Sequence, residues 1–429
     1  MTTRRTAMKA LAGGVGAMLA AGALPGCSRS SRRTVRFTFS KREAIGFMNQ
    51  VIADYNASQD RYEVVMDTSG PGAISASFVR GAPPDLMLAR HNHEISRFIQ
   101  RCTLSDLSDT DIAATIDPGT SPLSEPFGEC TGRISTLPYS SMACAIVYNK
   151  RIFAEHDLRI PTTWTELIEL CDTLMDAGIT PFYATFADAW TVGQGWFDYA
   201  IGGALDVDAF YRQLTAQGTD VGAGSAVSFQ KDFLEPIERM QLLARDYTQS
   251  DAKSRTYDFG NVEFARGGGA MYMQGPWAMA EVAKIDPEVE LGTFPLPMTE
   301  DPADLKVVAS IDLATMIPQD AANPEGARDF LAHLYEPQII EAYNASQMGF
   351  VPTTTSAIPT DPRIAGMVDA YTTGAIYLAP GQINPPAIPT NNYAQSLVLG
   401  ADARTILGSM DADWARVAFR RSASASKEA

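Results

Sequence analysis

The sequence predicts an α/β fold with more than one lobe, on the evidence of two observations. Near the N-terminus, short apolar runs alternate with helical patterns, and strands are expected at residues 35–39, 62–66 and 83–88. This strand–helix–strand rhythm favours a largely parallel sheet covered by helices. The chain of 429 residues is also long enough for two or three domains with separate cores.

The first 26 residues have the order of regions that is typical of an export signal. A basic segment with Arg4, Arg5 and Lys9 precedes an apolar and small-residue stretch over 11–24. The segment Leu-Pro-Gly-Cys that ends at Cys27 resembles the bacterial lipobox, after which the cysteine is acylated. We therefore expect an exported protein whose lipidated Cys27 anchors it to the outer face of the cell membrane. The twin arginines leave Tat and Sec export both open.

Charge and cysteine usage limit the classes of partner and site. The chain has 34 basic and 50 acidic residues, a net charge of −16, which argues against nucleic acid as a partner. Cys102 and Cys130 bracket a polar segment of an exported protein, so we predict a disulfide between them. Cys144 and Cys171 lie in apolar patterns and are expected to be buried thiols. Because no Cys-x-x-Cys pattern exists, structural zinc is not expected.

The most informative stretch is 262–282. Residues 270–273 form an apolar run short enough for a buried strand, and Gly275-Pro276 then turns the chain. Since proline suits the first position of a helix, Trp277 is expected in the first helical turn, beside unpaired backbone N–H groups. An indole at that place can face a cleft. The alternative is that Trp277 is ordinary core.

This stretch carries a resemblance to a known family. The pattern Phe-x-x-Gly-x-x-Ala-Met-x-x-x-Gly-Pro-Trp-Ala, at 264–278, resembles the signature region of the extracellular solute-binding proteins of ABC importers, the family of maltose-binding protein. Three further segments resemble that family in the expected order, at 138–150, 161–181 and 349–353. The resemblance implies a two-lobed periplasmic-binding-protein-like fold, in which three chain crossings form the hinge.

The resemblance also implies how the chain is divided. We expect a signal peptide with lipobox over 1–26 and a tether over 27–34. The first lobe would comprise 35–141 and 312–350, and the second 142–311 and 351–421. A loose tail over 422–429 would end the chain.

The function implied by the resemblance is reversible capture of a carbohydrate in the cleft between the lobes. The closed, loaded protein would dock on a membrane permease whose ATPase partner drives import. The protein would act as a monomer, without a cofactor and without a metal. The chain departs from the maltose-binding pattern at Met142, where a carboxylate is expected, so maltodextrin itself is not implied as the ligand.

Candidate ligand-binding residues follow from the same resemblance. In the family, the tryptophan after Gly-Pro often stacks on a sugar ring, whose C–H face packs on an aromatic plane, and this role falls on Trp277. Trp190 falls where the family has a sugar-contacting aromatic, and Trp196 is a further candidate. Asp312 interrupts an apolar strand over 307–317, so it either binds ligand hydroxyls or makes a structural hydrogen bond. Ser40, Glu43, His91 and Asn92 are candidates because they lie in loops at the carboxyl ends of predicted strands, where α/β sheets bind ligands. The other candidates are Tyr139, Asn391, Asn392 and Tyr393.

Two other classes of function stay open at this point. A carbohydrate-active enzyme displayed as a lipoprotein is one, although the sequence has no nucleophile-elbow motif and no phosphate-binding loop. A binder of another solute, such as a polyamine or a metal, is the second. His91 and His93 could be two metal ligands on one strand edge, but they have no matching third ligand.

Overall fold

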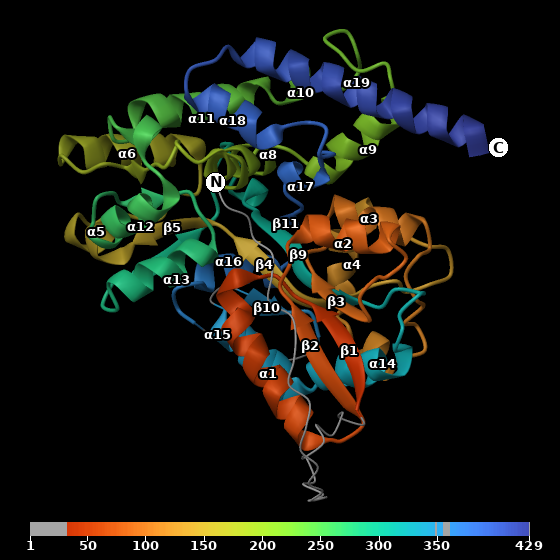
Figure 1. The fold of residues 1–429 in the computed structure, drawn as a ribbon. Helices are drawn as coiled ribbons and strands as arrows, with labels where there is room; N and C mark the ends of the chain where they lie inside the picture. Colours follow the sequence, from red (N-terminus) through yellow and green to blue (C-terminus); the bar gives the residue numbers. More distant parts are fainter. Residues whose placement is uncertain (1–31, 348–349, 355–360, 429) are drawn as a thin grey trace, which may run out of the picture.

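The computed structural model describes residues 32–347, 350–354 and 361–428. The first lobe is built on a seven-stranded sheet with the order β10-β4-β9-β3-β1-β2, in which β11 pairs with β9 (Figure 1). Its strands are β1 (Arg33–Thr38), β2 (Tyr62–Asp67), β3 (Leu86–Ala89), β4 (Leu137–Cys144), β9 (Val307–Met316), β10 (Phe350–Pro352) and β11 (Ile376–Tyr377).

The strand directions correct the prediction of a largely parallel sheet. β1 is parallel to β2 and β3, as the strand–helix–strand rhythm predicts. β9 is antiparallel to β3 and β4, and β4 is antiparallel to β10. The difference arises because β4 and β9 are long strands in the chain segments that connect the lobes. The strand–helix–strand pattern of the N-terminal segment does not indicate in which direction these later strands join the sheet.

Helices cover both faces of this sheet because successive side chains of a strand point to opposite sides. Leu86 and Leu88 pack with α1 (Ile45–Ser58), α14 (Pro324–Leu334) and α15 (Pro337–Ser346). Met87 packs with α2 (Pro71–Val79), α3 (His93–Gln100) and α4 (Ser121–Ser124). The helical chain breaks between α14 and α15 before Pro337, since proline cannot donate to the preceding turn.

The second lobe contains a four-stranded sheet with the order β6-β7-β5-β8. The run at 270–273 provides β7, and Trp277 lies in the first turn of α13, as predicted. The strands are β5 (Ile146–Asn149), β6 (Phe182–Tyr183), β7 (Met271–Tyr272) and β8 (Leu291–Phe294). The helices are α5 (Lys150–Glu155), α6 (Trp164–Asp176), α7 (Ala189–Thr191), α8 (Asp198–Gly202), α9 (Val207–Gln217), α10 (Phe229–Asp232), α11 (Leu234–Asp246), α12 (Tyr257–Ala265), α13 (Pro276–Ile285), α16 (Ala365–Thr372), α17 (Pro380–Ile383), α18 (Thr390–Val398) and α19 (Ala403–Glu428).

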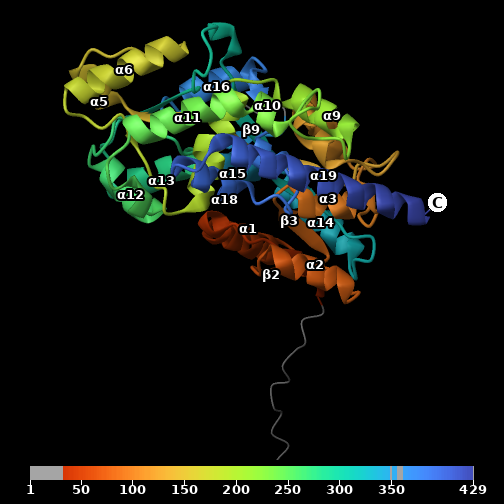
Figure 2. The ribbon, with the colours of Figure 1, turned by 90° about the horizontal axis from the view of Figure 1, so that it is seen from above.

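The ends of the described chain differ from the expected division. β1 begins at Arg33, inside the expected tether over 27–34. α19 continues to Glu428 and runs along the second lobe beside α10 and α18 (Figure 2), so the expected loose tail over 422–429 is helical up to that residue. Neither glycine nor proline occurs after Gly408 to stop the helix. The export signal and Cys27 lie outside the described residues.

The four cysteines of the described residues form one disulfide and two buried thiols. Cys102, after α3, is bonded to Cys130, and their Cα atoms lie 5.3 Å apart. Cys144 and Cys171 are free and buried. Among the described residues, no group of three or more His, Cys, Asp or Glu side chains is placed to hold a metal ion. In the same part of the chain, no helix has the length and apolar character needed to cross a membrane.

Candidate functional site

A cleft with a volume of about 1270 Å³ lies between the two lobes. The first lobe contributes the segments after β1 and β3 together with α2, and the second lobe contributes α7, α12 and α13. The segments after β1 and β3 follow the carboxyl ends of parallel strands, where open α/β sheets bind ligands. Six of the residues singled out in the sequence line this cleft: Ser40, Glu43, Asn92, Trp190, Trp277 and Asp312.

Three aromatic side chains form the wall that the second lobe presents to the cleft. The rings of Trp190 and Tyr257 lie 4.9 Å apart at 61°, and those of Trp190 and Trp277 lie 6.3 Å apart at 53°. Both spacings lie in the range that tilted and edge-to-face aromatic pairs prefer, so each ring supports its neighbour. Trp277 is only partly buried and its Nε1 donates to Gln274 Oε1 at 3.2 Å.

The Gly-Pro-Trp sequence explains how the indole of Trp277 is placed. Pro276 occupies the first turn of α13, where its missing N–H costs nothing. A Cβ atom at Gly275 would lie 2.2 Å from the Trp277 ring, so the indole folds over a space that only glycine leaves open. The side chain is thereby held at the helix start, with one region of its surface facing the cleft.

Asp312 lies on β9 at the floor of the cleft and is only 3% exposed. Its Oδ2 accepts from Lys41 Nζ at 2.5 Å, and its Oδ1 lies 4.0 Å from Arg90 Nε. A carboxylate at this depth requires a charged partner, and Lys41 from the segment after β1 supplies it. The structure thus shows the structural pairing of the Asp312 carboxylate and places the same residue in the lining of the cleft, where a ligand would lie.

A smaller hollow of about 140 Å³, the inner chamber, continues from the cleft. The chamber is bounded by β4, β9, α8 and α17 and by the turn between β3 and α3. Met142, at the position where the family pattern has a carboxylate, provides part of its apolar lining. The cleft and the chamber share six lining residues, which are Arg90, Asn92, Met142, Gln194, Trp277 and Asp312.

Four further polar residues line the inner chamber, Gln194, Asp198, Gln382 and Asn391, and of these only Asn391 was a candidate from the sequence. They come from three segments that only the fold brings together. Within the described chain, the amides of Gln194, Gln382 and Asn391 make no hydrogen bond to another protein group. Asp198 stands in the apolar run Trp-Phe-Asp-Tyr-Ala-Ile, so the reasoning applied to Asp312 could have identified it too.

Burial shifts the pKa values of two groups that line the inner chamber. It raises the pKa of Asp198 to about 7, against the opposing effect of the hydrogen bond that Gly381 N donates to its Oδ1 at 2.8 Å. Burial lowers the pKa of His91 to about 4, and the ring of His91 packs edge-on against Phe127 at 4.9 Å. His91 is therefore neutral at physiological pH, and its buried Nδ1 has no hydrogen-bond partner among the described residues.

Two aromatic candidates from the sequence lie in the cores of the lobes and not in the cleft. Trp196 is 1% exposed and packs against Phe182 and Phe186. The turn between Trp190 and Trp196 is a π-helix over Val192–Phe197, which rotates the second indole away from the first. Tyr139 is fully buried in the first lobe. We therefore leave Trp196 and Tyr139 out of the proposed site.

Of the three candidates in the loop near residue 390, one reaches the site. Asn391 lines the inner chamber, whereas Asn392 is exposed and Tyr393 donates its hydroxyl to Asp413 Oδ2 at 2.8 Å. Asn391 approaches the backbone of the π-helix closely, since a Cβ atom at Gly193 would lie 1.9 Å from its Oδ1.

A direct hydrogen bond between α3 and α17 joins the lobes beside the inner chamber. His93, at the start of α3 in the first lobe, places its Nε2 at 2.6 Å from the carbonyl oxygen of Ile383, in α17 of the second lobe. Since a carbonyl oxygen only accepts, Nε2 carries the proton. The structure thus shows the lobes in contact on one side of the cleft.

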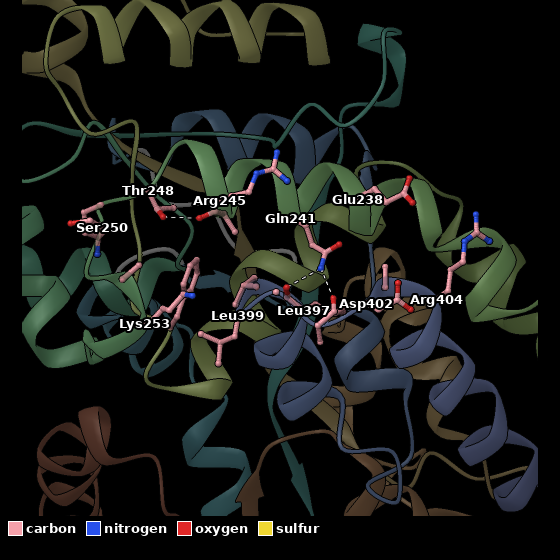
Figure 3. A pocket seen from close by; sticks show the side chains of 18 residues that line it. Glu238, Gln241, Arg245, Thr248, Ser250, Lys253, Leu397, Leu399, Asp402 and Arg404 are labelled. Carbon is pink, nitrogen blue, oxygen red and sulfur yellow. Dashed lines mark hydrogen bonds between the residues drawn. The ribbon is translucent and has the colours of Figure 1, made fainter.

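Another hollow, of about 660 Å³, lies outside the cleft between α11 and the turn from α18 to α19 (Figure 3). The Gln241 amide spans it and donates to the carbonyl oxygens of Leu397 and Ala401, at 2.9 and 2.8 Å. Gln241 therefore holds the α18–α19 turn, and no aromatic wall comparable to Trp190 and Trp277 lines this hollow. The interlobe cleft is the better candidate for a ligand site.

The family model and the curated relatives that match this chain are all solute-binding proteins. Residues 41–340 match the family model described as bacterial extracellular solute-binding protein, a family of binding proteins and not of enzymes. The multiple sugar-binding protein of Streptococcus mutans is 26% identical over 49% of this chain and 49% of its own length. The sn-glycerol-3-phosphate-binding periplasmic protein UgpB of Yersinia pseudotuberculosis is 25% identical over 63% of this chain and 59% of its own. The chain thus matches about half the length of these curated relatives.

Solved structures show the same fold over nearly the whole chain. The solute-binding protein RafE in complex with raffinose superposes with a TM-score of 0.75 at 21% identity. The superposition covers 90% of this chain and 99% of that one. The two-lobed fold predicted from the sequence is thereby confirmed.

Proposed function

The chain belongs to the bacterial extracellular solute-binding protein family, and from this premise we propose that it captures an oligosaccharide in the interlobe cleft for an ABC importer. The observation that carries the proposal is the aromatic wall of Trp190, Tyr257 and Trp277 opposite polar side chains of the first lobe. A sugar ring presents C–H groups on its faces and hydroxyls at its rim, and this wall and these polar groups complement both.

The size of the cleft favours a ligand of more than one ring. Its volume of about 1270 Å³ exceeds the roughly 300–1,000 Å³ of common small-molecule pockets. The aromatic wall and the inner chamber are joined through shared lining residues, so one ligand can occupy both. An extended oligosaccharide fits this arrangement better than a single monosaccharide does.

Capture requires that the lobes close on the ligand. A ligand that contacts both lobes favours the closed state by its extra affinity for that state. The His93–Ile383 hydrogen bond lies where the lobes meet, so it adds to the stability of the closed form. In the proposed cycle this closed form docks on the permease, whose ATPase drives import.

Anchoring and oligomeric state complete the proposal. The family description places these proteins outside the cell. Acylation of Cys27, after the lipobox-like Leu-Pro-Gly, would hold this protein at the outer face of the membrane, where it would act as a monomer. Mass spectrometry of the membrane fraction tests the anchor, because Cys27→Ser would remove the acyl mass and release the protein.

Thermal unfolding against a panel of solutes tests the ligand class. A ligand that binds only the folded protein raises the melting temperature by mass action, and 100 times Kd corresponds to about 2.7 kcal/mol. The panel contains raffinose, stachyose, maltotriose and xylo-oligosaccharides, with sn-glycerol 3-phosphate, spermidine and zinc for other classes. A shift with one sugar class supports the proposal. A shift with glycerol phosphate, polyamine or metal alone contradicts the sugar assignment.

A further inference from the structure

We propose that the Asp198 carboxylate binds ligand directly, by accepting hydrogen bonds from hydroxyls of the sugar's end ring inside the inner chamber. This inference rests on the proposed function and names a determinant of the same site. The chamber, of about 140 Å³, is well below the roughly 300 Å³ at which common ligand pockets begin, so it admits one end group and not a whole oligosaccharide.

The geometry leaves one side of the Asp198 carboxylate for a ligand. The residue is 2% exposed and lines the chamber. Gly381 N donates to its Oδ1, and within the described chain its Oδ2 accepts no hydrogen bond from protein. A buried carboxylate with one donor is poorly compensated, whereas two or three donors would satisfy it. Hydroxyl groups of a sugar are donors of the required kind.

The surroundings of Asp198 supply the other contacts that an end ring needs. The side-chain amides of Gln194, Gln382 and Asn391 line the chamber and can both donate and accept. Trp277 and Met142 provide apolar surface for the C–H groups. A polyhydroxylated ring can therefore be held on several sides, with its hydroxyls directed to Asp198 and the amides.

A structural role for Asp198 is the main competing explanation. Its Oδ1 accepts the N–H of Gly381 near the start of α17, and this contact alone could account for a buried carboxylate. Asp198→Asn separates the two roles, because an amide oxygen can still accept from Gly381 N while the charge is lost. A carboxylate that only holds α17 would leave sugar affinity unchanged in this variant.

Asp198 also confers a distinctive dependence on pH. Its pKa of about 7 means that the free protein is largely protonated at this site below neutrality. A sugar hydroxyl that donates to Asp198 prefers the ionised form, so affinity should rise as pH rises through 7. Within the described chain, the titratable and charged groups that face Asp198 or share the chamber are Cys144 on β4, Tyr199 on α8, Tyr211 on α9, Tyr377 on β11, and His91, Arg90 and Asp312. Burial raises the pKa values of the thiol and the three phenols and lowers that of His91 to about 4, so none of these five titrates near 7.

The test is calorimetric titration of the purified protein with the sugar that stabilises it most, using raffinose as the first probe. For the wild-type protein, affinity at pH 6 should be about tenfold weaker than at pH 8. Asp198→Asn should bind about tenfold more weakly than wild type at pH 8, and its affinity should not vary between pH 6 and 8. Asp411→Asn is the matched control, since Asp411 is also buried and accepts from Phe229 N at a helix start, away from the cleft.

The outcomes separate this inference from the proposed function. Wild-type affinity in Asp198→Asn, or the wild-type pH profile in that variant, would overturn the role of Asp198 while sugar binding stands. Affinity that rises as pH falls would also overturn it, because Asp198 would then donate and not accept. If the wild-type protein binds no sugar of the panel, the proposed function fails first. A loss of folding in Asp198→Asn is detected by its melting curve, and Asp198→Glu then provides the pH profile.

Discussion

Trp190 and Trp277 lie with their ring centroids 6.3 Å apart and their planes inclined at 53°, although they are 87 positions apart in the sequence. One comes from α7, before the π-helix, and the other from the first turn of α13. Together they form two faces of an angled aromatic surface. A ligand that lies along this surface contacts both rings, so the two side chains should contribute to binding as a pair.

Removing either indole should weaken sugar binding strongly. Burying a large apolar side chain against a ligand contributes about 1.5–3 kcal/mol, so Trp277→Ala and Trp190→Ala should each lose about 10- to 150-fold in affinity. Calorimetry with the sugar selected by the thermal panel measures this loss. Trp164→Ala is the control, because Trp164, at the start of α6, packs under Arg239 of α11, outside the cleft. Equal losses in all three variants would show that general destabilisation is responsible.

Breaking the ion pair at the floor of the cleft should destabilise the protein. The side chains of Lys41 and Asp312 are 9% and 1% exposed, so Lys41→Met leaves a buried carboxylate without its main partner. Removing one member of a buried pair typically costs about 3–5 kcal/mol. Arg90 moderates the cost, because its Nε lies 4.0 Å from the same carboxylate.

Denaturant unfolding measures the loss of stability in Lys41→Met, and Lys284→Met is the matched control. Lys284 pairs with Glu281 at the surface, where a salt bridge contributes about 0.2–1 kcal/mol. We expect Lys41→Met to reduce the free energy of unfolding several times more than Lys284→Met. Similar losses in the two variants would mean that the floor of the cleft is hydrated and the pair is weak.

Loss of the hydrogen bond between the lobes should favour the open form. A neutral hydrogen bond contributes about 0.5–1.5 kcal/mol, so His93→Phe should reduce sugar affinity about 2- to 10-fold by weakening closure. Small-angle X-ray scattering should show a larger radius of gyration for the variant without ligand. His156→Phe, at the exposed end of α5, should change neither quantity. An unchanged radius of gyration and affinity in His93→Phe would exclude a role in closure.

The disulfide should stabilise the first lobe without affecting the ligand. Cys102 and Cys130 are 28 residues apart, and closing a loop of this length contributes about 3–4 kcal/mol in the chain-entropy model. A double Cys→Ala variant should therefore melt at a lower temperature. Its sugar affinity at 25 °C should equal that of the wild type, since neither cysteine lines the cleft. A parallel loss of affinity would mean that the loop between them shapes the site.

Local patterns predicted much of the fold and part of the site. The Gly-Pro-Trp sequence placed Trp277 at the start of a helix, and the geometry explains why, since Gly275 leaves space for the indole. Asp312 was singled out because a carboxylate in an apolar strand is costly unless it is paired or faces a cleft. Its partner Lys41 could not be identified, because 271 residues separate them and only the sheet brings them together.

The site residues predicted from the sequence were wrong or incomplete where the fold, and not a local pattern, decides the position of a side chain. Trp190 and Trp196 are equivalent by composition, and a π-helix between them decides which faces the cleft and which enters the core. The inner chamber draws Asp198 and Gln382 from separate segments, so no local pattern marks them as a group. β4 alternates its side chains between the two faces of the sheet and has a register irregularity after Pro138, and Tyr139 consequently enters the core.

A crystal structure of the protein with the sugar of highest affinity tests the central claim most directly. We predict a sugar ring packed against Trp277 and Trp190, with the end ring in the inner chamber beside Asp198 and both lobes in contact with the ligand. Sugar bound only in the hollow of Figure 3, or a cleft that stays empty at saturating sugar, would contradict the account.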